Sequence, residues 1–190
     1  MKSLLEITWH GRGGQGAVTA AKLVAEAALL EGKHIQAFPE YGAERSGAPV
    51  RSYTRISDTP IRIHSQVKTP DIVIILDPTL LAAVDVTAGV REDGIFIVNT
   101  PLSPKDMRKE LDISGRRIFT VDATSISIEN LGRNIPNTPM VGALIKVAPI
   151  LKPEKLMDYF KEQYASKFNS SVIEGNLKAI KAAYEAVKGE

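Results

Sequence analysis

Hydrophobic positions along the chain switch between the spacing of strands and the spacing of helices. Residues 4–9 alternate between apolar and polar and stop at Gly11, which predicts a first strand. The Ala- and Leu-rich stretch 17–31 has its apolar residues on one stripe, so it predicts a helix that Gly32 ends. A short strand is expected at 34–38. We interpret this strand, glycine turn, helix and strand as one βαβ unit.

The next part of the chain departs from that pattern and then returns to it. After a polar loop at 38–49, the apolar runs 50–56 and 61–63 flank a Ser-Asp-Thr-Pro turn and predict a hairpin. Three later segments are continuously apolar, as expected of central parallel strands that are covered on both faces. These segments are 72–76, 95–98 and 118–121, and helical stretches are expected between them.

From Val121 onward the pattern is mostly helical. Thr138 and Pro139 are predicted to be the N-cap and the first residue of a helix, and Pro153 is predicted to open another. The last helix has a stripe of apolar residues that alternate at spacings of four and three. They are Ile173, Leu177, Ile180, Tyr184 and Val187.

Length and composition narrow the class of protein. The 190 residues suffice for one well-buried domain, and no internal repeat or linker divides them. We therefore expect residues 1–190 to form a single α/β domain, with a Rossmann-like, mostly parallel sheet, a hairpin insertion and a helical C-terminal region. The formal net charge is only +2, which gives little long-range attraction for nucleic acid.

The sequence also bears on location. No apolar run approaches the ~18 residues that a membrane span requires. Glu6 lies where a signal peptide needs its apolar stretch. We expect a cytoplasmic protein that binds neither a membrane nor nucleic acid.

Cysteine is absent from the chain. This excludes disulfides and thiolate ligation of zinc or of an ordinary iron–sulfur cluster. The histidines, His10, His34 and His64, show no ligand spacing and are interpreted as strand-end or surface residues. If the protein takes part in redox chemistry, its metals are expected on another chain.

A glycine-rich loop joins the first strand to the first helix. Residues 11–16, Gly-Arg-Gly-Gly-Gln-Gly, match GxGxxG between a predicted strand and helix. Without Cβ atoms the backbone can approach an anion at a helix N-terminus, so phosphate or pyrophosphate is the natural ligand. NAD(P) binding is disfavoured, because the second strand runs into Phe38-Pro39 and the nearest acid is Glu40. Three interpretations of the loop stay open: it binds another phosphate-bearing ligand, it forms a partner interface, or it only packs the strand against the helix without a ligand.

The most specific signal comes from three stretches: WHGRGGQGA at 9–17, QAFPEYGAERSGAP at 36–49 and IPNTPMVGA at 135–143. In sequence, order and total length they resemble the gamma subunit, or gamma domain, of 2-oxoacid:ferredoxin oxidoreductases, above all of the pyruvate enzyme. The second stretch is the most informative, because nothing in a generic α/β domain demands it. Gly13 stands where some members of the family have Ala.

The resemblance implies a subunit of a larger enzyme. The whole enzyme decarboxylates a 2-oxoacid on thiamine diphosphate, passes electrons through [4Fe-4S] clusters to ferredoxin, and transfers the acyl group to coenzyme A. Its alpha, beta and ferredoxin-like delta subunits are implied to hold the thiamine diphosphate, its Mg²⁺ and the clusters. The gamma subunit is then a largely structural α/β domain that holds no cofactor alone and has no catalytic residue or turnover of its own. The sequence leaves open whether the substrate is pyruvate or a branched-chain 2-oxoacid. It also leaves open whether two such enzymes share this subunit.

Candidate site residues follow the ends of the predicted strands. Ligands of an open parallel sheet collect outside the carboxyl ends of its strands. The glycine loop, the 39–49 loop, Asp77, Asn99 and Asp122 should therefore share one edge. We expect this edge to face the catalytic centre of a partner subunit and to line the coenzyme A channel. The residues assigned to it are Gly11, Arg12, Gly13, Gly14, Gln15, Gly16, Glu40, Tyr41, Arg45, Asn137 and Thr138.

Specific contacts are expected from the loops at this edge. The N–H groups of residues 13–16 are expected to bind phosphate or partner backbone, and Arg12 or Arg45 to pair with phosphate or carboxylate. Glu40 and Arg45, with Glu44, have an alternative role as a salt-bridge cluster within the loop. Tyr41 is either an interface anchor or a plug over the core.

Other candidates also have structural alternatives. Asn137 and Thr138 are most simply a helix start, and Asp77 and Asp122 are possible helix caps.

The sequence contains no nucleophile–base pair, HExxH or GxSxG motif, which argues against a self-contained hydrolase. Two alternatives for the whole protein stay open: a free-standing NAD(P)- or nucleotide-binding Rossmann-like protein, and a non-enzymatic nucleotide-binding or scaffold module.

Overall fold

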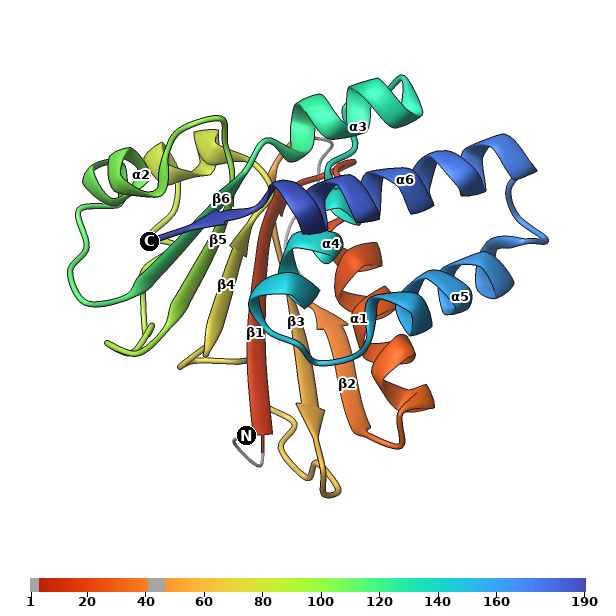
Figure 1. Cartoon of the computed structure of the whole chain (residues 1–190). Helices are drawn as coiled ribbons and strands as arrows, with labels where there is room; N and C mark the ends of the chain where they lie inside the picture. Colours follow the sequence, from red (N-terminus) through yellow and green to blue (C-terminus); the bar gives the residue numbers. More distant parts are fainter. Residues whose placement is uncertain (1–3, 41–46) are drawn as a thin grey trace.

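The computed structural model describes residues 4–40 and 47–190, and its described strands form one seven-stranded sheet (Figure 1). The strand order is β2-β3-β1-β4-β5-β6-β7. The strands are β1 (Leu4–Arg12), β2 (His34–Pro39), β3 (Pro49–Ser57), β4 (Ile72–Ile75), β5 (Ile95–Asn99), β6 (Arg117–Val121) and β7 (Lys188–Gly189).

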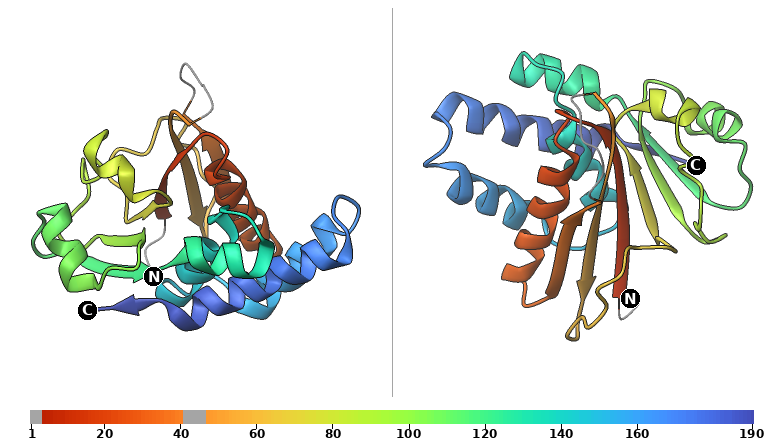
Figure 2. Two further views of the ribbon diagram at one scale, coloured as in Figure 1. Left: turned by 90° about the horizontal axis from the view of Figure 1, so that it is seen from above. Right: turned by 180° about the vertical axis from the view of Figure 1, so that it is seen from behind.

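Helices cover both faces of this sheet unequally. The helices are α1 (Ala17–Leu30), α2 (Pro104–Leu111), α3 (Ala123–Leu131), α4 (Asn137–Val147), α5 (Pro153–Tyr164) and α6 (Ser170–Ala186), with a 3₁₀ helix, η1, at Pro78–Ala82. The views from the front and from above place α1, α4, α5 and α6 on one side of the sheet, and η1 and α2 on the other (Figures 1 and 2). The sheet is therefore the middle of three layers.

The central strands separate two hydrophobic clusters. Ile72 and Ile74 of β4 belong to the cluster beneath α1, α4, α5 and α6, whereas Val73 and Ile75 belong to the cluster beneath α2. All four side chains are at most 1% exposed. The predicted central strands are thus confirmed, since a strand covered on both faces needs apolar residues at every position.

Strands β1, β4, β5 and β6 run parallel, while β3 lies antiparallel between β1 and β2. The mixed α/β class with a parallel centre is confirmed. The first two strands are not neighbours, however, so the expected βαβ unit has β3 inserted between its strands. The hairpin partner of β3 is β2 rather than residues 61–63, which form no strand. Both edges of β3 are already occupied, and this segment therefore has no edge of β3 to pair with.

The helix boundaries agree with the sequence pattern except at one start. Gly32, with φ +76°, follows α1, and Pro153 opens α5 as predicted. The prediction for α4 is wrong by two residues, since the helix begins at Asn137 with Pro136 as its N-cap. Thr138 does not cap the helix, because its hydroxyl donates a hydrogen bond to Asn176 Oδ1 of α6 at 2.8 Å.

The C-terminal helix packs closely on α4. Ile173 and Ile180 of the predicted stripe are buried, and Leu177, Tyr184 and Val187 pack against the hydrophobic cluster that contains Ile180. At Gly142 of α4, a Cβ atom would lie 2.1 Å from the carbonyl oxygen of Ile180. The approach of α6 to α4 therefore requires glycine at this position.

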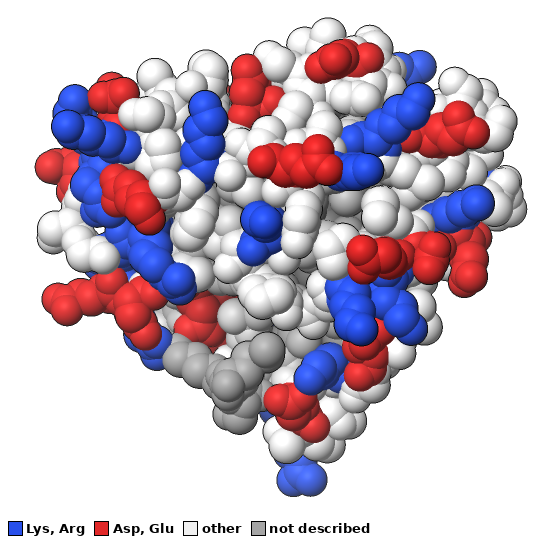
Figure 3. Space-filling model, in the orientation of Figure 1, with Lys and Arg blue, Asp and Glu red and all other residues white. Residues whose placement is uncertain are grey.

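Charges are interspersed over the molecule. On the face shown in Figure 3, basic and acidic side chains alternate without a large region of one sign. In the part of the chain that the structure describes, no helix has both the length and the hydrophobicity to cross a bilayer.

Candidate functional site

The glycine loop closes on itself at the end of β1. Gln15 Oε1 accepts from Arg12 N at 2.7 Å, and Gln15 N donates to Arg12 O at 3.0 Å. Gly14 and Gly16 have φ values of +97° and +80°, a region that residues with a Cβ rarely adopt. The backbone of this loop therefore favours glycine at positions 14 and 16.

The loop is fixed to the end of β4 by a polar cluster that we call the Asp77 clamp, formed by Arg12, Gln15, Asp77 and Thr79. Gln15 Nε2 donates to Asp77 Oδ2 at 2.7 Å, and Arg12 Nε lies 3.4 Å from the same oxygen. Arg12 Nη2 donates to Thr79 Oγ1 at 2.8 Å. Burial opposes ionisation of Asp77, but hydrogen bonds from Thr79 and Gln15 outweigh it, so the pKa of Asp77 is lowered.

The same loop is also hydrogen-bonded to the start of β3. Gly13 N donates to Ala48 O at 2.9 Å, Gly47 N donates to Gly13 O at 3.3 Å, and Arg12 Nη1 donates to Gly47 O at 3.1 Å. The expectation that Gly13 and Gln15 offer their N–H groups outward is wrong, because both donate within the chain. Among the described residues, the N–H groups of Gly14 and Gly16 have no acceptor.

Other predicted edge residues lie at the carboxyl ends of the neighbouring strands. Asn99 Nδ2 donates to Leu76 O at 2.7 Å, and Asn99 Oδ1 accepts from Thr124 N at 3.0 Å. Asp122 Oδ1 accepts from Ser125 N at 2.9 Å, which caps α3. Asp77 likewise caps η1. The prediction that Asp77 and Asp122 cap the helices that follow them is confirmed. Asp77 also contacts the glycine loop through Gln15.

Glu40 follows β2 and is paired within the sheet. Tyr53 Oη donates to Glu40 Oε2 at 2.5 Å, and Arg51 Nε lies 3.4 Å from that oxygen. The predicted salt-bridge partners Glu44 and Arg45, together with Tyr41, lie outside the described residues.

His10 is a buried strand residue rather than a surface one. Its side chain is only 5% exposed, and desolvation, followed by the charge of Arg51, lowers its pKa to about 4. Its ring is therefore neutral at pH 7. The other two histidines, His34 and His64, are exposed.

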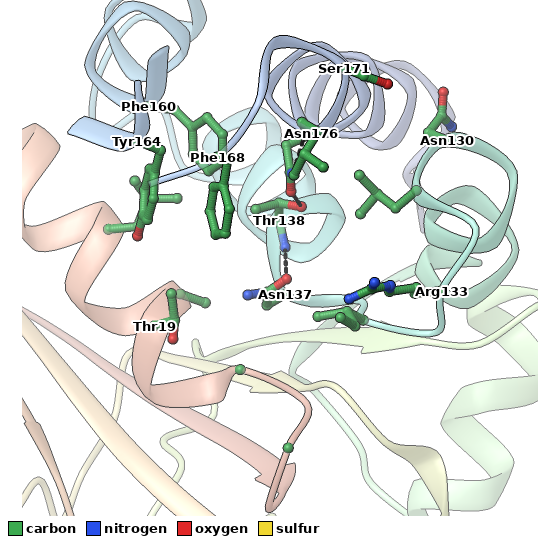
Figure 4. A pocket seen from close by; sticks show the side chains of 17 residues that line it. Thr19, Asn130, Arg133, Asn137, Thr138, Phe160, Tyr164, Phe168, Ser171 and Asn176 are labelled. Atoms are coloured by element: carbon green, nitrogen blue, oxygen red, sulfur yellow. Dashed lines mark hydrogen bonds between the residues drawn. The ribbon is translucent and has the colours of Figure 1, made fainter. Parts of the chain in front are cut away.

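A pocket of about 600 Å³ lies between the glycine loop and helices α3–α6 (Figure 4). Gly14, Gly16, Asn137 and Thr138 all line it, so the pocket joins two of the predicted site segments. The contact is close, since a Cβ at Gly16 would lie 2.5 Å from Asn137 Nδ2. Asn137 thus packs directly on the N-terminus of α1.

The remaining walls come from residues that the sequence did not indicate. Phe160, Tyr164 and Phe168 form an aromatic wall, with ring centroids 4.6 and 5.5 Å apart in sequence order. Arg133 extends into the pocket from the opposite side, and Asn176 lies at its floor (Figure 4). No sequence motif marks these positions, because tertiary packing alone brings them to the glycine loop.

Within residues 4–40 and 47–190, no group of three or more His, Asp or Glu side chains is arranged to hold a metal ion. The features with binding potential in this region are the pocket, the N–H groups of Gly14 and Gly16, which have no acceptor among the described residues, and the guanidinium of Arg133.

Comparison with known proteins places this arrangement in a family. The model of the family described as pyruvate ferredoxin/flavodoxin oxidoreductase matches residues 6–186. The chain is 48% identical to the pyruvate/ketoisovalerate oxidoreductases common subunit gamma of Pyrococcus abyssi, covering 96% of each chain. It is 46% identical to the pyruvate synthase subunit PorC of Thermotoga maritima, covering 98% of this chain and 96% of the relative.

The fold agrees with this relationship. The crystal structure of the pyruvate oxidoreductase subunit PORC from Thermotoga maritima superposes with a TM-score of 0.87 at 43% identity, covering 100% of this chain and 99% of the other. Family model, relatives and fold all extend over nearly the whole chain. The chain therefore belongs to the pyruvate ferredoxin/flavodoxin oxidoreductase family, as one of its gamma-type subunits and hence as part of an oxidoreductase.

Proposed function

We propose that this chain supports the oxidative decarboxylation of a 2-oxoacid, most specifically pyruvate, by a thiamine-diphosphate-dependent enzyme that forms acyl-coenzyme A and reduces ferredoxin. In this proposal the glycine-loop edge lines the channel for coenzyme A and faces the catalytic centre on another subunit. The observation that supports it is the glycine loop at the carboxyl end of β1, held to Asp77 after β4, with two N–H groups that have no acceptor among the described residues. The N–H groups of Gly14 and Gly16, at the N-terminus of α1, favour an anionic group there.

The division of labour follows from residue chemistry. The chain has no cysteine with which to ligate [4Fe-4S] clusters, so we assign the clusters, thiamine diphosphate and Mg²⁺ to alpha, beta and delta subunits. We assign no catalytic residue to this chain and expect no turnover from it alone. Residues 1–190 act as one gamma domain, which is supported by a single sheet that contains strands from both ends of the described chain. We place the complex in the cytoplasm.

Pyruvate is proposed over other 2-oxoacids because pyruvate appears in the names of both relatives described above. The name of the Pyrococcus abyssi protein also includes ketoisovalerate. A gamma chain shared between two enzymes is compatible with this proposal, because substrate choice then depends on the other subunits.

The test is anaerobic purification of the tagged chain from its native host, with partner masses and iron content measured together. Co-purification of iron and a thiamine-diphosphate-binding chain, with pyruvate- and coenzyme A-dependent reduction of ferredoxin, is the expected result. Elution as an iron-free single chain would overturn the proposal. So would oxidation of pyruvate by the isolated chain with an artificial electron acceptor.

A further inference from the structure

The pocket at the glycine loop has an apolar side that continues onto the protein surface. Tyr164 packs against Phe160 in a tilted arrangement and stacks with Phe168, which is 44% exposed. Val172, at the start of α6, also lines the pocket and is 38% exposed. Contiguous exposed apolar surface of this kind marks interaction sites on otherwise polar proteins.

The polar groups at the floor of the pocket are already paired with one another. Thr138 Oγ1 donates to Asn176 Oδ1 at 2.8 Å, and Asn176 Nδ2 donates to Val172 O at 2.8 Å. A site built for a small polar ligand presents several unpaired, convergent groups. This floor offers few, so the binding capacity of the pocket lies mainly in its apolar wall.

Arg133 gives the pocket its charge. Among the described residues, its guanidinium has neither a hydrogen-bond acceptor nor a salt-bridge partner, and it extends toward the pocket opposite the aromatic wall (Figure 4). None of the described residues that line the pocket is an Asp or Glu. The N-termini of α1 and α4 at the same pocket have no side-chain cap and add positive potential. The complementary occupant is therefore apolar and bears an acid.

We propose that this pocket receives a segment of another subunit of the same enzyme. That segment places an aromatic or aliphatic side chain against Tyr164 and Phe168 and an Asp or Glu carboxylate at Arg133. Aromatic residues and arginine are the types enriched at the centres of protein–protein interfaces. The inference rests on the proposed function, since it requires a partner subunit, and it specifies where the partner binds.

The experiment reconstitutes the holoenzyme anaerobically from a gamma-free complex and purified variants of this chain. Phe168→Asp and Arg133→Glu are compared with Leu30→Asp, which alters a 64% exposed residue in the last turn of α1. Circular dichroism and urea denaturation check that each variant folds. We expect Kd for the gamma-free complex to rise at least about tenfold for the two pocket variants and to stay unchanged for the control.

Crosslinking identifies the segment itself. Since the chain has no native cysteine, Ser171→Cys introduces one unique thiol beside the pocket for a thiol-linked photo-crosslinker. In the reconstituted holoenzyme, the expected product joins this thiol to one acid-bearing apolar segment of another subunit. Leu30→Cys is the matched control and should not crosslink to that segment.

Two outcomes overturn the inference. The first is that Phe168→Asp and Arg133→Glu bind the gamma-free complex as tightly as the wild-type chain; if their KM for coenzyme A is raised as well, the pocket belongs to a small anionic ligand instead. The second is crosslinking that does not depend on position 171. Failure of the wild-type chain to join any complex is distinguishable, because it removes the proposed function itself.

Discussion

Replacing Gly142 with alanine tests the packing that holds α4 against α6. The added Cβ would lie 2.1 Å from the carbonyl oxygen of Ile180 and 2.9 Å from its carbonyl carbon. Both atoms belong to the backbone of α6, so no side-chain rotation relieves the contact. The two helices must separate, and the buried residues between them lose contacts.

The expected magnitude is the balance of two opposing effects. In a helix, alanine is more favourable than glycine by about 1 kcal/mol, which alone predicts a more stable variant. Overpacking of a close helix–helix contact costs about 1–3 kcal/mol and more when backbone must move. Because the contact is with backbone at 2.1 Å, we take the upper end and expect a net loss of roughly 2 kcal/mol. For a chain of this size, that loss lowers Tm by about 4–8 °C.

Urea denaturation of the purified chain, followed by the fluorescence of Trp9, measures this change. Trp9 is fully buried in the same hydrophobic cluster as α4 and α6. Lys178→Ala, at an exposed position of α6, is the matched control and should shift the free energy of unfolding by less than about 0.5 kcal/mol. A Gly142→Ala variant as stable as the wild-type chain, or more so, refutes the close-approach argument.

Three further predictions follow from buried or clustered polar groups. Burial and the charge of Arg51 lower the pKa of His10 from 6.5 to about 4, so below pH 6.5 the unfolded chain binds a proton that the folded chain does not. The free energy of unfolding should therefore fall by about 3 kcal/mol as the pH drops from 6.5 toward 4, and His10→Gln should abolish this part of the slope in a pH series of urea titrations. Glu6→Gln leaves the guanidinium of Arg55, 1% exposed, without the carboxylate 2.8 Å away, and should cost about 3 kcal/mol in the same assay. Adding Arg55→Met should recover most of that loss, and a double variant as unstable as the single one contradicts the ion-pair explanation. Asp77→Asn weakens the clamp on the glycine loop and, on the proposed function, should raise the holoenzyme's KM for coenzyme A about tenfold without preventing assembly. An unchanged KM would count against a role of the loop in binding coenzyme A.

Local hydrophobic spacing predicted most helices and strands but not the order of the strands. The continuously apolar segment 72–76 was correctly interpreted as central, since only burial on both faces demands such a run. The position of β3 between β1 and β2 depends on which edges pair, and spacing within one segment contains no information about its neighbours. Residues 61–63 have the local spacing of a strand, but that spacing could not show that both edges of β3 are already paired, with β1 and β2.

For the candidate site, the sequence likewise predicted the segments involved but not the contacts between them. The positive φ at Gly16 explains why the last glycine of the motif was informative, and Gly14 has a positive φ although the motif leaves its position open. The partner of Gln15 is a carboxylate 62 positions away, and the contact of Asn137 with Gly16 joins segments that are further apart still. The sequence indicated that these stretches were special, but their contacts exist only once α4 lies against α1.

The glycine loop differs from a self-contained phosphate-binding loop in how its polar groups are used. Gly13 N, Gln15 N and the guanidinium of Arg12 all find partners within the chain, which makes the loop rigid. Rigidity of this kind lowers the entropic cost of presenting the remaining N–H groups of Gly14 and Gly16. Those groups and Arg133 face a pocket whose described lining offers no acid to pair with them. The loop thus presents a fixed positive surface that no Asp or Glu among the described lining residues neutralises, and on the inference above the carboxylate that pairs with it belongs to a partner subunit.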